Sequence, residues 1–348
     1  MPRPFLSKEP APKPGLHHGR VTALFGCLLL VCSLSGVCCA ELPDYYQSVD
    51  RVIWVVRDVK HVVQGWKKLG LSDIHEYPDT GFTARYRDRQ VMIHVRRTTG
   101  QLGSLRVDLL QPAKGEQNVF SDFLSKHGDG IFAVVHAVSG KGDIDKEEQR
   151  LSSLGVRVLQ EATIAEASGP CSFTFFDTER EGKFVLGLSY SPYIAAPANG
   201  LRVVSHIAPV VRDPQAVAAF WHRLGFPDFT MEHATPREDS RYRGKPLLLS
   251  FEVGFQRFGQ MSYEWITPPA TPPNIYSDFL RLHGEGIQHL GLPVENLGEA
   301  AAKYEKLGYT VWQSGAWGDV GKPHSGQYDY MDTEAIGGVS VELIHAYQ

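Results

Sequence analysis

Residues 206–226 read HIAPVVRDPQAVAAFWHRLGF, a short β-branched run that leads directly into a helix pattern. Asp213 is a natural N-cap, Pro214 suits the first helical position, and Gly225 suits the end of the helix. The earlier stretch RVIWVVRDVKHVVQGWKKLGL, residues 51–71, has the same pattern, with an aspartate and a glycine at the matching places. The two stretches therefore predict a duplicated strand–helix unit.

The duplication continues beyond these stretches. SDFLSKHGDGI at 121–131 matches SDFLRLHGEGI at 277–287, and the spacing between copies stays constant to within one residue. Each half also has a weaker internal repeat, since NLGEAAAKYEKLG at 296–308 again predicts a capped helix that ends at glycine. The segments PLLLSFEV, QMSYEWIT, GQYDYMD and GVSVELIH are rich in β-branched and aromatic residues and predict strands. The predicted unit is βαβββ, present four times in a chain of the α+β class.

Two domains are expected from this repeat. A chain of 348 residues is long enough for two domains that each bury their own core. The Pro- and Ala-rich segment YSPYIAAPANG at 190–200 resembles a linker between them. We therefore expect an N-terminal domain over residues 50–190, the N-terminal half, and a C-terminal domain over residues 201–348, the C-terminal half.

The first 40 residues differ from the rest of the chain. A basic lead is followed by the apolar run VTALFGCLLLVCSLSGVCCA, which is short for a membrane span. This pattern predicts a signal peptide over residues 1–40, cleaved before Glu41. The alternatives are an uncleaved anchor or a lipoprotein attached through a leader cysteine. We expect export to a periplasm or the medium, and no membrane segment after cleavage.

The cysteines and the charge narrow the possible classes of protein. Four of the five cysteines lie in the leader, so Cys171 alone would remain and no internal disulfide could form. The formal net charge is −4, and beyond the leader we find no basic stripe or phosphate loop. This composition argues against a nucleic-acid partner.

Four ionisable residues interrupt the apolar strand patterns of the C-terminal half. They are His206 and Glu264, on the first and last predicted strands of the third unit, and His289 and Glu342, at the same places in the fourth. A core-facing strand should avoid such groups, because an unpaired buried charge costs several kcal/mol. Strand alternation turns Glu342 away from the apolar face of its strand. Two imidazoles and two carboxylates would suit one divalent cation such as Zn, Ni, Co, Mn or Fe.

The N-terminal half provides an internal control for these four positions. The repeat aligns them with Arg51, Asp108, Ala133 and Gly187, of which only the aspartate could bind a metal. We therefore expect the N-terminal half to keep the fold and to lack the metal.

With four βαβββ units and these four positions, residues 50–348 resemble the vicinal oxygen chelate superfamily. The resemblance is strongest in SYEWITPPATPPNIYSDFLRLHGEGIQHLGLPVENL and in MDTEAIGGVSVELI, which are similar to glyoxalase-type and epimerase-type members. The family includes glyoxalase I, methylmalonyl-CoA epimerase, ring-cleaving dioxygenases and the bleomycin-resistance proteins. The resemblance implies that units pair into two cupped half-barrels, with His206, Glu264, His289 and Glu342 as the metal ligands of the second.

The resemblance also implies a chemistry. In the family a substrate with neighbouring oxygens chelates the cation, which stabilises an enolate or a similar oxyanion. In a glyoxalase or an epimerase, a glutamate beside the metal removes a proton next to the carbonyl and returns it elsewhere. Glu342 is the expected base, and Glu264 is its counterpart across the pseudo-twofold axis. We therefore expect an isomerase or lyase of the glyoxalase I or methylmalonyl-CoA epimerase type.

Two other functions remain open at the level of sequence. An Fe(II) dioxygenase would use His206, His289 and Glu342 and leave Glu264 outside the metal shell, because oxygen chemistry needs open coordination sites. A binding protein without turnover, like the resistance proteins, would not need the four ligands. Glu264 therefore discriminates between the isomerase or lyase and the dioxygenase.

The predicted substrate contacts are less specific than the ligands. The loop SGAWGDVGKPHSGQYDYMD at 314–332 either closes the cup, through Trp317, Lys322, His324 and Tyr328, or is an ordinary glycine-rich connection. Arg241, Arg243 and Lys245 could neutralise an acidic substrate or belong to a solvated hairpin. Export is unusual for enzymes of thioester substrates, so an unrelated small carbonyl compound is expected. The paired domains would allow a monomer or a homodimer.

Overall fold

The structure is a computed structural model that describes residues 41–166, 168–193, 204–259 and 261–348. The predicted signal peptide, and most of the predicted linker, lie outside the described residues. Within the described residues, no helix has both the length and the apolar character needed to cross a membrane.

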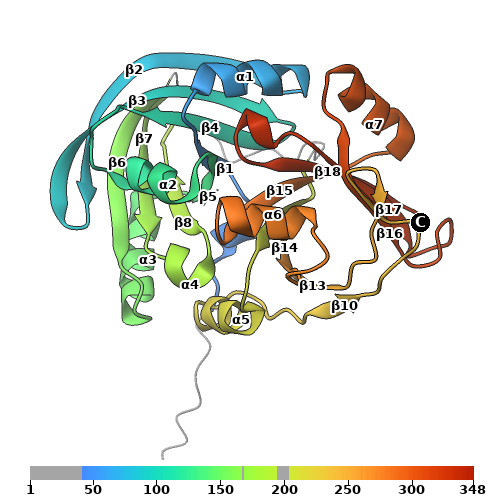
Figure 1. The fold of residues 1–348 in the computed structure, drawn as a ribbon. Coiled ribbons are helices and arrows are strands. Elements are labelled where there is room, and N and C mark those ends of the chain that lie inside the picture. The colour runs from blue at the N-terminus through green and yellow to red at the C-terminus, as the bar shows by residue number, and fades with distance from the viewer. Residues whose placement is uncertain (1–40, 167, 194–203, 260) are drawn as a thin grey trace, which may run out of the picture. The chain divides into compact units, whose positions relative to one another are not determined.

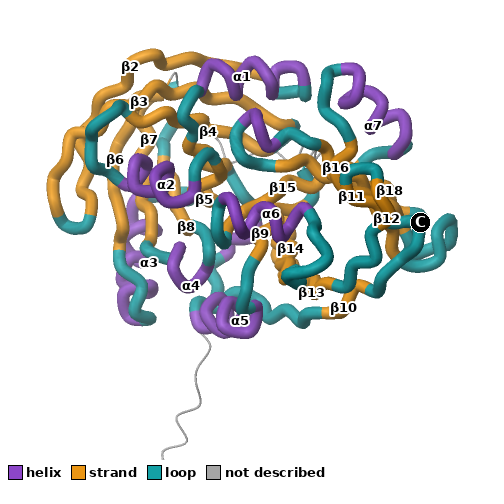
Figure 2. Tube along the Cα trace, in the orientation of Figure 1, coloured by secondary structure: helices purple, strands orange, loops and turns teal. Residues whose placement is uncertain are grey.

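The N-terminal half contains two βαβββ units (Figure 1). The first consists of β1 (Arg51–Val55), α1 (Val59–Lys68), β2 (Ser72–Tyr86), β3 (Arg89–Leu102) and β4 (Leu105–Pro112). Helix α2 (Val119–His127) leads to the second, which consists of β5 (Gly130–Ala137), α3 (Lys141–Ser153), β6 (Val158–Glu166), β7 (Gly169–Phe176), α4 (Glu179–Gly182) and β8 (Val185–Tyr190). The long strands β2 and β3 curve together along one side of this half (Figure 2).

The C-terminal half repeats this order with one interruption. The third unit consists of β9 (His206–Val210), α5 (Pro214–Arg223), β10 (Glu232–Ala234), β11 (Arg241–Tyr242), β12 (Lys245–Pro246), β13 (Phe251–Phe258) and β14 (Met261–Thr267). After α6 (Ile275–Leu282), the fourth consists of β15 (Gly286–Pro293), α7 (Leu297–Lys306), β16 (Val311–Trp317), β17 (Gly326–Met331) and β18 (Ser340–Ala346). The prediction of one strand over PLLLSFEV was wrong, because β12 ends at Pro246 and β13 begins at Phe251.

The helix caps predicted from the sequence are present in the structure. The Asp213 carboxylate accepts the backbone N–H of Ala216 at 2.9 Å and so caps α5, and Gly225 follows the helix with a φ of +90°. The Asn296 side chain caps α7 by accepting the backbone N–H of Glu299 at 3.1 Å. These caps place the two helices at matching points of the third and fourth units.

Strand pairing joins the units two by two. In the C-terminal half β9 runs parallel to β14 and antiparallel to β15, and β15 runs parallel to β18. In the N-terminal half β1, β4, β5 and β8 pair in the same way. The result is two cupped half-barrels, each with four central strands at its floor.

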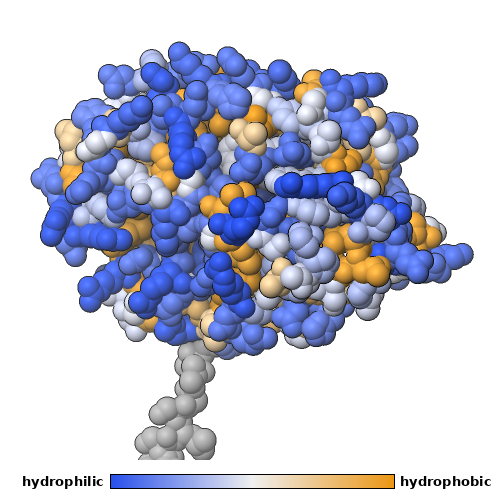
Figure 3. All heavy atoms as spheres, viewed as in Figure 1, coloured by the Kyte–Doolittle hydropathy of each residue, from blue (hydrophilic) through white to orange (hydrophobic). Residues whose placement is uncertain are grey.

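The two halves contact each other through symmetric aromatic anchors. The indole of Trp66 in α1 donates to the carbonyl of Ile336 at 2.8 Å, and that of Trp221 in α5 donates to the carbonyl of Gly182 at 3.2 Å. Both tryptophans are fully buried in the largest core cluster. Polar side chains dominate the visible face of the surface (Figure 3).

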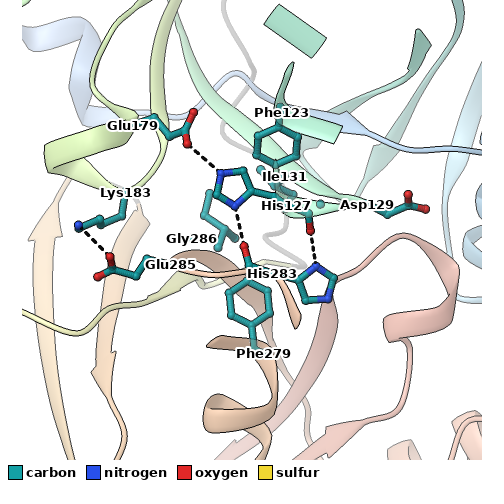
Figure 4. Close-up of a pocket in the computed structure, with 12 residues that line it drawn as sticks. Phe123, His127, Asp129, Ile131, Glu179, Lys183, Phe279, His283, Glu285 and Gly286 are labelled. Atoms are coloured by element: carbon teal, nitrogen blue, oxygen red, sulfur yellow. Dashed lines mark hydrogen bonds and ion pairs between the residues drawn. The ribbon is translucent and has the colours of Figure 1, made fainter. Parts of the chain in front are cut away.

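A reciprocal histidine pair lies where the two halves meet (Figure 4). The Nδ1 of His127 is 2.6 Å from the carbonyl oxygen of His283, and the Nδ1 of His283 is 2.7 Å from the carbonyl oxygen of His127. Their Nε2 atoms face Glu179 at 2.8 Å and Glu334 at 3.2 Å. The pair therefore ties α2 to α6 by two symmetric hydrogen bonds.

Candidate metal centre

Four side chains from the floor strands of the C-terminal half converge on one point. His206 Nε2 lies 3.1 Å from an oxygen of Glu264, 3.1 Å from an oxygen of Glu342 and 3.2 Å from His289 Nε2. His289 Nε2 lies 3.1 Å from the Glu264 oxygen and 3.4 Å from the Glu342 oxygen. All four residues are buried, and their donor atoms lie within 4.8 Å of one another.

This spacing fits a divalent cation. Each histidine nitrogen lies 3.1–3.4 Å from both carboxylate oxygens, and all four donor atoms lie within 4.8 Å of one another, so one ion with bonds of about 2 Å could contact all of them after small side-chain shifts. One oxygen of Glu342 supports the fit, because it is buried and makes no aligned hydrogen bond with a described residue. A buried carboxylate oxygen without a donor is costly unless a cation satisfies it. These residues could therefore hold one metal ion.

Neighbouring residues hold both imidazoles in the orientation of a ligand. The side-chain oxygen of Gln288 accepts the Nδ1 proton of His289 at 2.7 Å, and the hydroxyl of Ser205 lies 3.3 Å from Nδ1 of His206. When Nδ1 donates its proton, Nε2 keeps its lone pair for a metal. Neither partner was predicted from the sequence.

A β-bulge explains the position of Gln288. In the pairing of β15 with β9, Ile287 faces Pro209 and His289 faces Ala208, so Gln288 is an extra residue in β15. A bulge redirects a side chain that strand alternation would turn to the opposite face. Gln288 is thus buried beside its neighbour His289.

Gly291 makes room for the His206 ring. The two residues face each other across the β9–β15 pair, and a Cβ atom on Gly291 would collide with the imidazole. Any larger residue at position 291 would therefore displace the His206 imidazole from the cluster. The only sign in the sequence was a glycine within a strand, which often marks the close approach of another group.

The electrostatics of the cluster favour positive charge at its centre. Burial lowers the pKa of His206, but the carboxylates of Glu264 and Glu342 outweigh it and raise that pKa to about 10. The pKa of His289 is raised by the same two carboxylates against the same effect of burial. Burial and Glu264 raise the pKa of Glu342, but the two neighbouring histidines outweigh them and lower it below its usual range.

Tyrosines surround the ligands on one side. The Tyr330 ring lies 4.9 Å from the His289 ring, and its hydroxyl accepts a hydrogen bond from Tyr276 at 2.9 Å. The Tyr328 ring lies 5.5 Å from the Tyr330 ring. Burial, followed by the negative charges of Glu342 and Glu264, raises the pKa of Tyr328, which places this residue in the field of the cluster.

The comparisons with known proteins agree with this architecture. A family profile described as the Glyoxalase/Bleomycin resistance protein/Dioxygenase superfamily matches residues 50–175 and 205–325, well over half of the chain. The chain belongs to this superfamily. No curated protein matches this superfamily member.

Two solved structures are similar to this chain at low sequence identity. A mutant of 4-hydroxymandelate synthase from Streptomyces coelicolor has a TM-score of 0.60 and 15% identity, over 86% of this chain and 93% of that chain. A Mn(II)-bound glyoxalase from Novosphingobium aromaticivorans has a TM-score of 0.49 and 14% identity, over 87% of this chain and 83% of that chain. At 15% identity the similarity to the synthase concerns the fold alone.

Of the loop residues predicted to contact substrate, Tyr328 alone lies near the cluster, because its ring contacts Tyr330, which packs on His289. Trp317 faces Gly326 where the β16–β17 hairpin opens, and Gly326 pairs with Ala346 near the far end of β18. Lys322 and His324 are exposed in the turn of that hairpin.

The basic residues predicted to neutralise a substrate form part of a hairpin. Arg241 donates to the carbonyls of Glu238 at 2.6 Å and Ser240 at 2.8 Å, and Arg243 pairs with Asp278 at 3.1 Å. Lys245 is exposed at the start of β12. Their placement therefore agrees better with a solvated hairpin than with residues that neutralise a substrate.

Proposed function

We propose that this member of the superfamily is a metal-dependent enzyme that transfers a proton next to a carbonyl group. It would be an isomerase or lyase of the glyoxalase or epimerase type. In this proposal the C-terminal half, residues 201–348, carries the chemistry, and the N-terminal half, residues 50–190, is a scaffold without metal. A signal peptide over residues 1–40 would direct the protein out of the cell.

The observation that carries the proposal is the position of Glu264. Its carboxylate lies 3.1 Å from both histidine nitrogens and so belongs to the donor set. A dioxygenase of the two-histidine, one-carboxylate type keeps that position open for substrate and oxygen. Four protein donors support Lewis-acid chemistry over oxygen chemistry.

The proposed ligands are His206, Glu264, His289 and Glu342, around one Zn, Ni, Co, Mn or Fe ion. The bound cation would supply Lewis-acid stabilisation of the negative charge that develops on the substrate oxygen. The side chains of the two histidines, held by Gln288 and Ser205, would keep their orientation during turnover.

Glu342 is the proposed base. Its orphan oxygen lies 3.1 Å from His206 and 3.4 Å from His289 without an aligned hydrogen bond, whereas the Glu264 oxygen is hydrogen-bonded to His289. Turning the Glu342 oxygen toward a substrate therefore breaks no aligned hydrogen bond, whereas turning the Glu264 oxygen would break one. Glu342 would take the proton from the carbon next to the carbonyl and return it to the same or the adjacent carbon.

Metal analysis and isotope exchange on the purified protein would test the proposal. We expect about one divalent ion per chain, as for a single four-donor site. We also expect deuterium from the solvent to enter lactaldehyde, hydroxyacetone or the methylglyoxal hemithioacetal. Glu342→Gln should reduce this exchange by about 10²–10⁴-fold, as for loss of a general base, with a smaller loss of metal.

The matched control is Glu264→Gln, which should reduce metal content more than Glu342→Gln does. Normal exchange by Glu342→Gln would contradict the base assignment. Consumption of oxygen with a catechol, without any exchange in the carbonyl compounds, would support the dioxygenase instead.

A further inference from the structure

The pairing of β13 with β14 puts two unassigned residues beside the metal ligands. Phe255 lies directly opposite Glu264, and Arg257 lies opposite Ser262. Ser262 in turn lies beside His206 in the parallel β9–β14 pair. Because alternate residues of a strand share one face, Phe255 and Arg257 lie on the same face as Glu264.

Phe255 is the exposed member of this group. It keeps 38% of its surface accessible, while Glu264 keeps 8% and His206 keeps 6%. Its ring stands edge-on to the His206 ring, with 6.4 Å between the ring centres. An accessible aromatic ring therefore borders the buried ligands, where it can contact an apolar part of a bound molecule.

Arg257 completes the surface with a positive charge. Its guanidinium carbon lies 5.0 Å from the centre of the Phe255 ring, within the range of a cation–π contact. It makes no hydrogen bond or ion pair with any described residue, so its donors remain available. Six other described arginines of the C-terminal half have polar partners: Arg212, Arg223, Arg237, Arg241, Arg243 and Arg281.

The charge of the site makes this arginine relevant to a ligand. The charges of Glu264 and Glu342 would balance one divalent cation and leave none for a further anionic group of a substrate. A carboxylate held near the cluster would need its own cation, and a guanidinium matches the two oxygens of a carboxylate.

The N-terminal half again provides a comparison. In the β3–β4 pair, the residues opposite Asp108 and Arg106 are Thr99 and Gln101, at the positions equivalent to Phe255 and Arg257. Neither an aromatic ring nor a charge is present there. The aromatic and cationic pair thus accompanies the half that has the four metal donors.

We propose that Phe255 and Arg257 form a specificity subsite for a substrate that carries a carboxylate on a flat apolar frame, next to its chelating oxygens. The subsite rests on the proposed metal function, and it names the class of substrate. Phe255 contacts the frame, and Arg257 binds the carboxylate.

Binding of two related diols to the Mn²⁺-loaded protein tests the subsite by calorimetry. Catechol supplies the neighbouring oxygens alone, and 3,4-dihydroxybenzoate adds one carboxylate. We expect the acid to bind about 10–100-fold more tightly, the usual range for hydrogen bonds to a charged group. Arg257→Met should remove this preference and leave the affinity for catechol within about twofold, since its ring contacts remain.

Arg223→Met is the matched control. Arg223 lies over the Phe220 ring at 5.3 Å, on α5, and pairs with Glu181. This variant should keep the preference for the acid. Equal binding of the two diols by the parent protein, or a preference that survives in Arg257→Met, would overturn the subsite and leave the metal centre intact. Failure of both diols to bind the Mn²⁺-loaded protein would also overturn the subsite, whereas the proposed function is tested separately by metal content and deuterium exchange.

Discussion

The floors of the two half-barrels have the same strand register but carry different charged groups. In the C-terminal half His206 faces Gly291, and Gly291 pairs with Glu342. In the N-terminal half Arg51 faces Val135, and Val135 pairs with Gly187. The first arrangement leaves four donor atoms around one point. The second already contains a positive charge, the guanidinium cation of Arg51.

That cation is the centre of a buried ion network. Arg51 lies 2.7 Å from Asp50, 3.3 Å from Asp108 and 2.7 Å from Glu166. Arg97 also pairs with Asp108, at 2.7 Å, and with Glu166, at 2.8 Å. Burial would raise the pKa of Asp108, but Arg97 and Arg51 outweigh it and lower that pKa.

Aromatic packing fills the rest of the N-terminal floor. A Cβ on Gly187 would lie 3.0 Å from both Phe175 and Val135, so the place of Glu342 is taken by apolar side chains. Phe132, at the bulge position of Gln288, packs against Phe175 with 5.4 Å between ring centres. One fold thus supports either a donor set for a metal or a closed core, depending on a few floor residues.

The largest expected effect is a loss of stability when the N-terminal floor loses its central arginine. Arg51→Leu should lower the free energy of unfolding by about 3–5 kcal/mol, because it leaves buried carboxylates with too few cations. Urea denaturation of the metal-free protein measures it. The metal affinity of the C-terminal floor should not change.

Arg57→Leu serves as the control for this prediction. Arg57 is 65% exposed and pairs with Asp129 at 3.4 Å, so its loss should cost less than about 1 kcal/mol. Equal effects of the two variants would show that the Arg51 network is not a structural replacement for a metal.

A smaller effect is expected at the bulge of the C-terminal floor. Gln288→Leu should weaken metal binding by about 10–100-fold, since loss of the partner of a ligating histidine has that effect elsewhere. Competition with a chromophoric chelator measures the affinity. The control is Gln313→Leu, which removes another buried glutamine, whose oxygen accepts the Ile275 N–H at 3.1 Å. This variant should leave the metal affinity unchanged. Equal losses in both variants would argue against a specific role for Gln288.

The smallest effect concerns the histidine pair between the halves and depends on pH. Burial opposes ionisation of Glu179, but His127 and Lys126 outweigh it and lower its pKa from 4.5 to about 2. A lowered carboxylate pKa adds stability that is complete above about pH 4.5 and is lost as the pH falls through about 2. Glu179→Gln should therefore cost about 1–2 kcal/mol at pH 6, after allowance for its partial exposure, and almost nothing near pH 2.

The symmetric residue of the C-terminal half sharpens this prediction. Among the described residues Glu334 pairs with His283 alone, at 3.2 Å, and is 35% exposed, whereas Glu179 is 22% exposed and has the additional partner Lys126. Glu334→Gln should therefore cost less than Glu179→Gln in chemical denaturation at pH 6. A pH-independent loss in Glu179→Gln would contradict the electrostatic explanation.

Much of this arrangement could be predicted because repeats and periodicity are local properties. The caps of α5 and α7, and the choice of the four converging residues, follow from spacing and from charge within apolar strands. The strand prediction failed at PLLLSFEV, where an apolar run contains a break that pattern alone does not reveal. Gln288 was missed because a bulge reverses the direction that alternation assigns to it.

The sequence by itself determined the duplication, the βαβββ units and the four residues that could meet, since each depends on order along the chain. Tertiary structure decided which of their atoms face one point, through the glycine opposite His206 and the bulge beside His289. It also decided that Phe255 lies against His206 with Arg257 over its ring, while three of the predicted loop residues lie elsewhere. Distances across strands depend on register and on neighbouring side-chain volume, and neither is set by spacing along one strand.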